Sequence, residues 1–294
     1  MKLKHFLLAL VVMAIWGTNF VVIEWGLREF PPLAFACLRF FFSAVPALFF
    51  IKRPATPWRY LAAYGVLLGA GQFGLLFLAM NGHISPGLAS LIIQTQVIFT
   101  IVLSVVLFHE RVAATAIVGT TLALAGLATV GAHFDATVTP KGLALILCAA
   151  FCWGCANVTV KMAARRGPPF NMLAFIVWSS IFSVPPLLAL SLGFEGPAAV
   201  EVSVRNASLA AWAAVAWQAV GNTLFCFAAW SWLLAKYDAA VVTPYALLIP
   251  VFGMGASALI LGEPMPPWKF IAGAMVIGGI AIITLAPVLR RGRR

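Results

Sequence analysis

Hydrogen-bonding side chains recur in the middle of long apolar stretches of this sequence. Residues 14–20 read AIWGTNF and residues 152–158 read CWGCANV. Amide, hydroxyl and indole groups can bind a small polar molecule, and in hydrocarbon they are costly unless they pair or meet water. We therefore predict that they line a substrate-binding cavity. The predicted lining residues are Trp16, Thr18, Asn19, Gln72, Gln94, Gln96, Trp153, Asn157, Asn222 and Tyr245.

The alternative interpretation is that these polar groups join packed helices. Asn, Gln, Ser and Thr side chains form hydrogen bonds between membrane helices with a modest gain in stability, and tryptophans also serve as packing residues. For any single residue the two interpretations stay open. For the whole set a cavity is favoured, because the apolar stretches 112–132 and 267–288 contain no Asn or Gln.

Three charged residues within apolar stretches have a possible role in binding or transport, namely Glu24, Arg39 and Lys161. Glu24 is four residues before Arg28. The structural interpretations are a Glu24–Arg28 pair, a Glu24–Arg39 bridge between two helices, or side chains that extend to the membrane surface. We favour these structural roles for Arg39 and Lys161, and we expect the nearby cations to keep Glu24 ionised, so that it carries no proton.

The positions of the reactive side chains argue against an enzyme. The four histidines lie at the ends of apolar stretches, no Asp lies near the middle of one, and the five cysteines are typical of packing residues. A membrane enzyme, such as an intramembrane protease or acyltransferase, would need a Ser and His, paired Asp residues or a set of metal ligands within the bilayer. The sequence also has no GxxxxGK[ST] nucleotide-binding motif. We predict no catalytic residue, no bound metal and no cofactor.

The composition places the chain in a lipid bilayer. Of its 294 residues, 63% are hydrophobic and 9% are charged, and the mean hydropathy is +1.03. Soluble domains have about a quarter charged residues. Since the backbone must satisfy its own hydrogen bonds in lipid, we expect an all-α polytopic protein. Ten stretches are long enough to span a core of about 30 Å: residues 6–27, 32–51, 58–80, 86–108, 112–132, 142–164, 170–192, 208–234, 239–261 and 267–288.

The net charge of +11 is distributed as in a membrane protein rather than as in a nucleic-acid-binding protein. With the N-terminus inside, 14 of the 19 Lys and Arg residues lie near the inner surface and the other 5 near the outer ends of the spans. This asymmetry predicts that both termini are cytoplasmic. The predicted inner cations are Lys2, Lys4, Lys52, Arg53, Arg59, Arg111, Lys161, Arg165, Arg166, Lys236, Arg290, Arg291, Arg293 and Arg294.

The two halves of the chain share ordered landmarks. A shift of 137 residues aligns Trp16 with Trp153 and Glu24 with Lys161, and a shift of 153 residues aligns FHERV at 108–112 with LGEPM at 261–265. Each half has five spans, and because five is odd the second half enters the membrane from the opposite side. We predict two inverted repeats, residues 1–136 and 137–294, which in many transporters surround a midplane site.

The order of four motifs resembles a known family. WGTNF at 16–20, LRF at 38–40, GLASLI at 87–92 and ER at 110–111 resemble the EamA-type branch of the drug/metabolite transporter superfamily, most closely its bacterial exporters of amino acids and their metabolites. The resemblance implies a cavity between the halves, lined mainly by helices 1, 3, 4, 6, 8 and 9, with helices 5 and 10 peripheral. Glu24 departs from the pattern, since relatives often have lysine there.

We therefore expect a secondary transporter of the bacterial inner membrane that exports amino acids or related small metabolites by alternating access. Its partners are then a small-molecule substrate and the lipid bilayer, and not nucleic acid. The alternatives are a lipid or polyisoprenoid flippase, or a multidrug exporter of the same fold. A flippase needs a basic headgroup pocket, and Arg39 alone does not make one.

Overall fold

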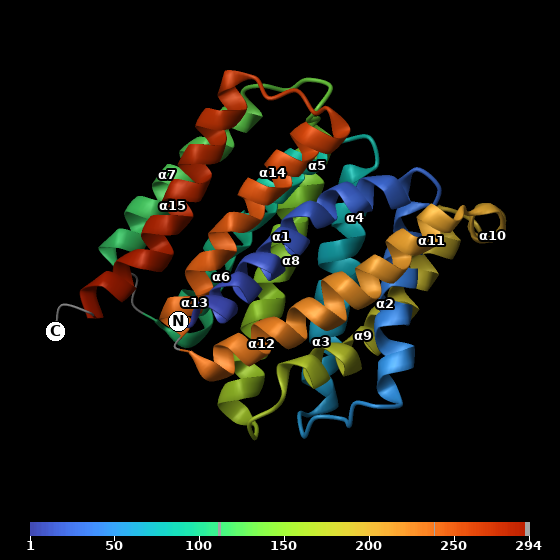
Figure 1. Ribbon diagram of the computed structural model, residues 1–294, viewed down its shortest axis with the longest axis horizontal. Helices are drawn as coiled ribbons and strands as arrows, with labels where there is room; N and C mark the ends of the chain where they lie inside the picture. The colour runs from blue at the N-terminus through green and yellow to red at the C-terminus, as the bar shows by residue number, and fades with distance from the viewer. Residues whose placement is uncertain (111–112, 238, 292–294) are drawn as a thin grey trace.

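The computed structural model describes residues 1–110, 113–237 and 239–291, and in these ranges every regular element is a helix (Figure 1). The first five spans are α1 (Leu3–Leu27), α2 (Pro32–Leu48), α3–η1–α4 (Trp58–Val66, Leu67–Gly74, Leu75–Met80), α5–η2–α6 (Pro86–Ile92, Ile93–Thr95, Gln96–Phe108) and α7 (Ala114–Gly131). The other five are α8 (Pro140–Arg166), α9 (Met172–Phe194), α11–η3–α12 (Leu209–Ala216, Trp217–Phe225, Cys226–Lys236), α13–η4–α14 (Ala239–Val242, Thr243–Leu247, Leu248–Leu261) and α15 (Pro267–Arg291). The predicted inner cations Arg111, Arg293 and Arg294, and the predicted first residue of the fifth span, Val112, lie outside the described residues.

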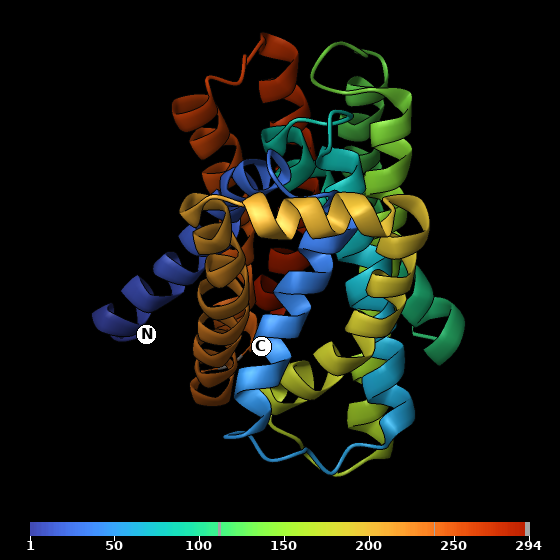
Figure 2. The same cartoon turned by 90° about the vertical axis from the view of Figure 1, so that its right-hand side faces the viewer.

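The prediction of a ten-span all-α membrane protein is confirmed. Within the described ranges, nine helical stretches are long and apolar enough to cross a membrane, and α2 is a shorter apolar helix of 17 residues. One helix was not predicted, namely α10 (Pro197–Asn206), which lies crosswise to the spans (Figure 2). The first helices of the two halves, α1 and α8, cross the bundle in opposite directions (Figure 1), as the odd number of spans requires.

Local sequence determines where the helices begin. Proline is the first residue of α2, α5, α8, α10 and α15. At this position an N–H would have no partner inside the helix, so proline loses no hydrogen bond, and its fixed φ is that of a helix. The side chains of Thr139, Asn171 and Ser208 each accept a hydrogen bond from an N–H in the first turn of α8, α9 and α11, respectively. These caps satisfy donors that have no partner inside the helix.

Two helix starts are capped by a glutamate from the other half of the chain. Glu195, just after α9, accepts hydrogen bonds from the N–H groups of Leu33 (2.6 Å) and Ala34 (3.0 Å) in α2. Glu263, just after α14, accepts one from the N–H of Gly87 in α5 over 2.9 Å. A carboxylate at a helix start also interacts favourably with the helix dipole. The same kind of contact therefore joins the halves at two places.

Irregular turns interrupt equivalent spans of the two halves. The third span of each half contains a π-helical segment, η1 or η3, and the fourth span of each half contains a 3₁₀ turn, η2 or η4. A π-helix is rare in proteins and often lies at a functional site. The interruptions therefore mark the third and fourth spans as the place to search for a site.

Small residues let the central helices approach closely. A Cβ atom on Gly17 of α1 would lie 2.5 Å from the Cβ of Phe252 in α14, and one on Gly253 would lie 2.3 Å from the Ser90 hydroxyl in α5. At one edge of the bundle α7 and α15 pack side by side (Figure 1). The peripheral position that the resemblance implies for these two spans is the one they have.

Candidate functional site

A cavity of about 950 Å³ lies between the two halves of the bundle, within the size range of small-molecule sites. Its described wall residues come from eight spans and from the α8–α9 loop, and none of them belongs to α7 or α15. Arg39 of α2 and Met172 of α9 line it in addition to the six helices that the resemblance implies. Eight of the ten predicted residues lie on its wall: Trp16, Asn19, Gln72, Gln94, Gln96, Trp153, Asn157 and Asn222.

The other two predicted lining residues, Thr18 and Tyr245, do not line this cavity, so the prediction is wrong for them. The Thr18 hydroxyl donates to the carbonyl oxygen of Ala14 at 2.7 Å, within its own helix. Tyr245 lies in the 3₁₀ turn η4 and packs against Phe6, with ring centroids 5.8 Å apart.

Several lining amides also join helices, so cavity lining and helix contact are not exclusive. The Asn157 amide of α8 donates to Gln96 Oε1 at 2.7 Å and to the Thr100 hydroxyl at 3.2 Å, both in α6. Asn19 of α1 and Gln218 of η3 exchange two hydrogen bonds, at 2.8 and 3.3 Å. Each pair connects the two halves at the cavity wall.

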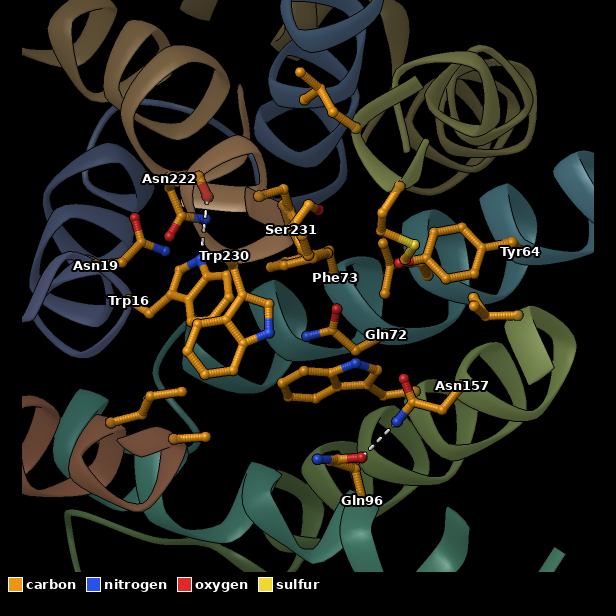
Figure 3. A pocket seen from close by; sticks show the side chains of 18 of the residues that line it. Trp16, Asn19, Tyr64, Gln72, Phe73, Gln96, Asn157, Asn222, Trp230 and Ser231 are labelled. Carbon is orange, nitrogen blue, oxygen red and sulfur yellow. Dashed lines mark hydrogen bonds between the residues drawn. The ribbon is translucent and has the colours of Figure 1, made fainter. Parts of the chain in front are cut away.

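Aromatic rings form one side of the cavity. Trp16 donates its indole N–H to the carbonyl oxygen of Asn222 at 3.2 Å, and its ring lies edge-on to Trp230, with centroids 5.6 Å apart. Figure 3 shows Trp16 and Trp230 together beneath Asn222, with Gln96 and Asn157 farther away and Gln72 between the two groups. The cavity wall therefore presents apolar rings and amide groups to the same space.

Arg39 is buried at the cavity wall, with 1% of its surface exposed. Its Nη1 donates to Gln218 Oε1 at 2.7 Å and its Nη2 donates to the Thr223 hydroxyl at 3.2 Å. The predicted alternative of a Glu24–Arg39 bridge is wrong, because both hydrogen-bond partners of Arg39 belong to η3, whereas Glu24 belongs to α1. Glu24 lies 4.0 Å from Arg28 and is not among the cavity-lining residues.

Lys161 lies near the C-terminal end of α8, on the side of the bundle that carries the α8–α9 loop. It does not line the cavity. Its Nζ lies 2.6 Å from Glu110 Oε2, and Arg165 Nη2 lies 2.6 Å from Glu110 Oε1. The hydrogen bond from Lys161, together with the Arg165 charge, holds the pKa of the Glu110 carboxyl below its ordinary value. This contact supports the structural interpretation of Lys161.

Among the described residues, the wall of the cavity reaches the face of the bundle that carries the α8–α9 loop. Its wall includes Phe170 and Asn171 in the α8–α9 loop and Leu234 and Ala235 at the end of α12. Elsewhere in the bundle, α1 packs closely against α14, and α14 packs closely against α5. The side that carries the α8–α9 loop is therefore the open side.

Gln218 and Thr223, which the sequence interpretation did not select, hold the cavity-lining Arg39 in place. Gln218 has 0% of its surface exposed and Thr223 has 1%, and together they hold Arg39. Gln218 lies near the middle of a predicted span, so the argument that selected Gln72 could have found it. Phe73, Ser231 and Tyr64 also line the cavity, and no sequence signal separates them from packing residues.

Comparisons with known proteins place the chain among transporters. The EamA-like transporter family matches residues 3–132 and again residues 140–285. The chain is 34% identical over 296 residues to a probable amino-acid metabolite efflux pump of Salmonella typhimurium, covering 100% of this chain and 99% of that protein. It is 34% identical to the protein of the same description in Escherichia coli K12, covering 96% and 95%. A solved crystal structure of a protein that is 18% identical aligns with this chain with a TM-score of 0.64, and the alignment covers both chains completely.

Proposed function

The chain belongs to the EamA-like transporter family, and from this premise we propose that it exports amino acids or related small metabolites by alternating access around the central cavity. The observation that supports the proposal most is the cavity itself, whose wall of amides and aromatic rings is contributed by both halves. A site between inverted repeats can open to either face when one half moves against the other.

The open face fits an exporter that is ready to load its substrate. The predicted topology places the α8–α9 loop in the cytoplasm, because Lys52, Arg53, Arg165 and Arg166 lie on that side. The cavity then opens to the cytoplasm, and its opposite end is closed by the contacts around Gly17 and Gly253. We propose this arrangement as the inward-facing state in the bacterial inner membrane.

Transport by the purified protein in proteoliposomes tests the function. Vesicles with and without protein are loaded with unlabelled leucine, cysteine or phenylalanine, and the exchange of the same labelled amino acid is measured. We expect protein-dependent exchange of at least one of them. Folded protein that exchanges none of the three, but moves a cationic dye, would instead indicate a multidrug exporter.

A matched pair of variants ties the exchange to the cavity. Ala228→Trp places a large ring at the cavity wall, whereas Ala125→Trp places the same ring on the exposed side of α7. We expect the first variant to lose exchange and the second to keep it, with both eluting as folded protein. Equal activity of the two variants would contradict transport through this cavity.

The orientation has its own test. Single cysteines replace Phe134, in the α7–α8 loop, and Ala55, in the α2–α3 loop, in a protein without its natural cysteines. A membrane-impermeant thiol reagent added to intact cells with a permeabilised outer membrane should label position 134 and leave position 55 unlabelled. The opposite pattern would place the termini outside and make the observed cavity outward-facing.

A further inference from the structure

The two π-helical segments carry equivalent amide groups. Gln72 follows Gly71 in η1, and Asn222 follows Gly221 in η3. Both amides line the cavity, each with 3% of its residue surface exposed. Gln72 Oε1 and Asn222 Oδ1 are buried without a hydrogen-bond partner in the described part of the chain. A buried polar atom without a partner costs free energy unless a ligand satisfies it.

Arg39 lies between these two segments. Its guanidinium group donates to Gln218 and Thr223, both in η3, and its Cζ lies 3.6 Å from the ring centroid of Phe73 in η1. The guanidinium is thus held by hydrogen bonds to two neutral side chains of η3 and by stacking on the Phe73 ring of η1. Because these contacts are neutral, the charge of Arg39 stays available for another partner.

No protein carboxylate balances this charge among the described residues. None of the ion pairs found there includes Arg39, and its Nε is buried without a partner. Arg39 is also the only described cavity-lining residue with a formally charged side chain. A guanidinium has five N–H donors in a fork that matches a carboxylate. The empty space beside it is the cavity.

We infer that Arg39 binds the carboxylate of the exported molecule, while the Gln72 and Asn222 amides bind its amino or acylamino nitrogen. This inference rests on the proposed function and names its substrate class: neutral amino acids and their N-substituted derivatives, with the side chain against Trp16 and Trp230. An amide can offer its oxygen or its nitrogen to the substrate by rotation. Cationic amino acids bind poorly, since the described wall has a positive charge and no acid.

Derivatives of one amino acid separate the carboxylate from the ammonium group. Exchange of labelled leucine, phenylalanine or cysteine, whichever the protein moves, is measured in competition with its N-acetyl derivative, its carboxamide and lysine. We expect the N-acetyl derivative to compete well and the carboxamide and lysine to compete at least about tenfold more weakly, as for the loss of one charge-assisted contact. A carboxamide that competes as well as the N-acetyl derivative overturns the inference and leaves the exporter function standing. The absence of exchange with any amino acid overturns both.

Variants of Arg39 assign the effect to this residue. Arg39→Gln should raise KM for the amino acid at least about tenfold and remove the preference for the N-acetyl derivative over the carboxamide. Arg39→Lys keeps the charge without the fork and should keep a weakened preference. Arg28→Gln, at an exposed arginine of the same charge, is the control and should change neither quantity. A normal preference in folded Arg39→Gln protein contradicts the assignment.

The amide pair has a matched control of its own. Gln72→Met removes an unpaired lining amide, whereas Gln94→Met removes a lining amide outside the π-helical segments. We expect the first change to weaken competition by the amino acid and its N-acetyl derivative alike, and the second to have a smaller effect. Equal effects of the two variants would remove the π-segment amides from the proposed site. If Arg39→Gln does not fold, the derivative series on the unmodified protein and on Arg39→Lys still decides the question.

Discussion

The Lys161 ammonium lies 2.6 Å from the Glu110 carboxylate and joins the two halves of the chain at the open face of the bundle. Glu110 follows α6, the fourth span, and Lys161 is near the end of α8, the sixth. Arg165 completes the contact at the same distance from the other carboxylate oxygen. The three side chains hold together α6 and α8, which contribute neighbouring parts of the cavity wall through Gln96 and Asn157.

Glu110→Gln should lower the melting temperature of the detergent-solubilised protein at pH 7 and have no effect at low pH. The partners of Glu110 lower its folded-state pKa, so its contribution to stability is complete above its unfolded pKa, near 4.5, and is lost as the pH falls through the lower folded value. Melting curves from pH 7 to 3 measure this. Glu201→Gln, in an exposed pair with Arg205, is the control and should have a smaller effect. A difference that persists unchanged at pH 3 would argue against the ion pair.

Glu263→Gln should be strongly destabilising. The Glu263 and Lys269 side chains are 5% and 0% exposed and lie 2.8 Å apart. Replacement of the carboxylate by a neutral amide leaves the Lys269 ammonium buried without this counter-charge. Loss of one partner of a buried pair costs about 3–5 kcal/mol, whereas replacement of both by apolar groups is often neutral. The double variant Glu263→Gln with Lys269→Met should therefore recover much of the stability. Size-exclusion profiles and melting temperatures measure this, and a double variant less stable than the single one would refute the explanation.

Gly253→Ala should destabilise the protein while Gly255→Ala, in the same helix, should not. A Cβ on Gly253 would lie 2.3 Å from the Ser90 hydroxyl, and a Cβ on Gly255 would meet nothing within 4 Å. Overpacking at a tight helix contact costs about 1–3 kcal/mol. Melting temperatures of the two variants give the comparison. Similar values for both would mean that α14 and α5 can separate at little cost.

His109→Gly should stabilise the protein and Gly262→Ala should destabilise it. The two residues end α6 and α14 in the same left-handed conformation, with φ of 53° and 68°, at equivalent positions of the two halves. A residue with a side chain pays about 1–2 kcal/mol for this conformation, and glycine does not. Thermal unfolding of both variants measures the effect. A destabilised His109→Gly variant would show that the imidazole has a compensating contact.

The sequence by itself determined the spans and much of the cavity wall. Hydrocarbon accepts only long apolar helices, so ten apolar stretches and an odd number of spans in each half define an inverted bundle. Polar groups are costly in lipid, so the positions of Asn19, Gln72 and Asn157 within apolar stretches were enough to assign them to the interior of the bundle.

Only the tertiary structure decided which polar groups meet at the site. It gave Arg39 neutral partners in η3 instead of Glu24, and it turned Thr18 and Tyr245 away from the cavity. A π-helical segment also changes the rotation of every residue that follows it, so the faces of the third and eighth spans could not be counted at 3.6 residues per turn. The physical reason is that lipid and the packed interior are equally apolar, so apolar residues do not mark the inner face of a membrane helix. Polar residues mark the interior but do not show which of them meet.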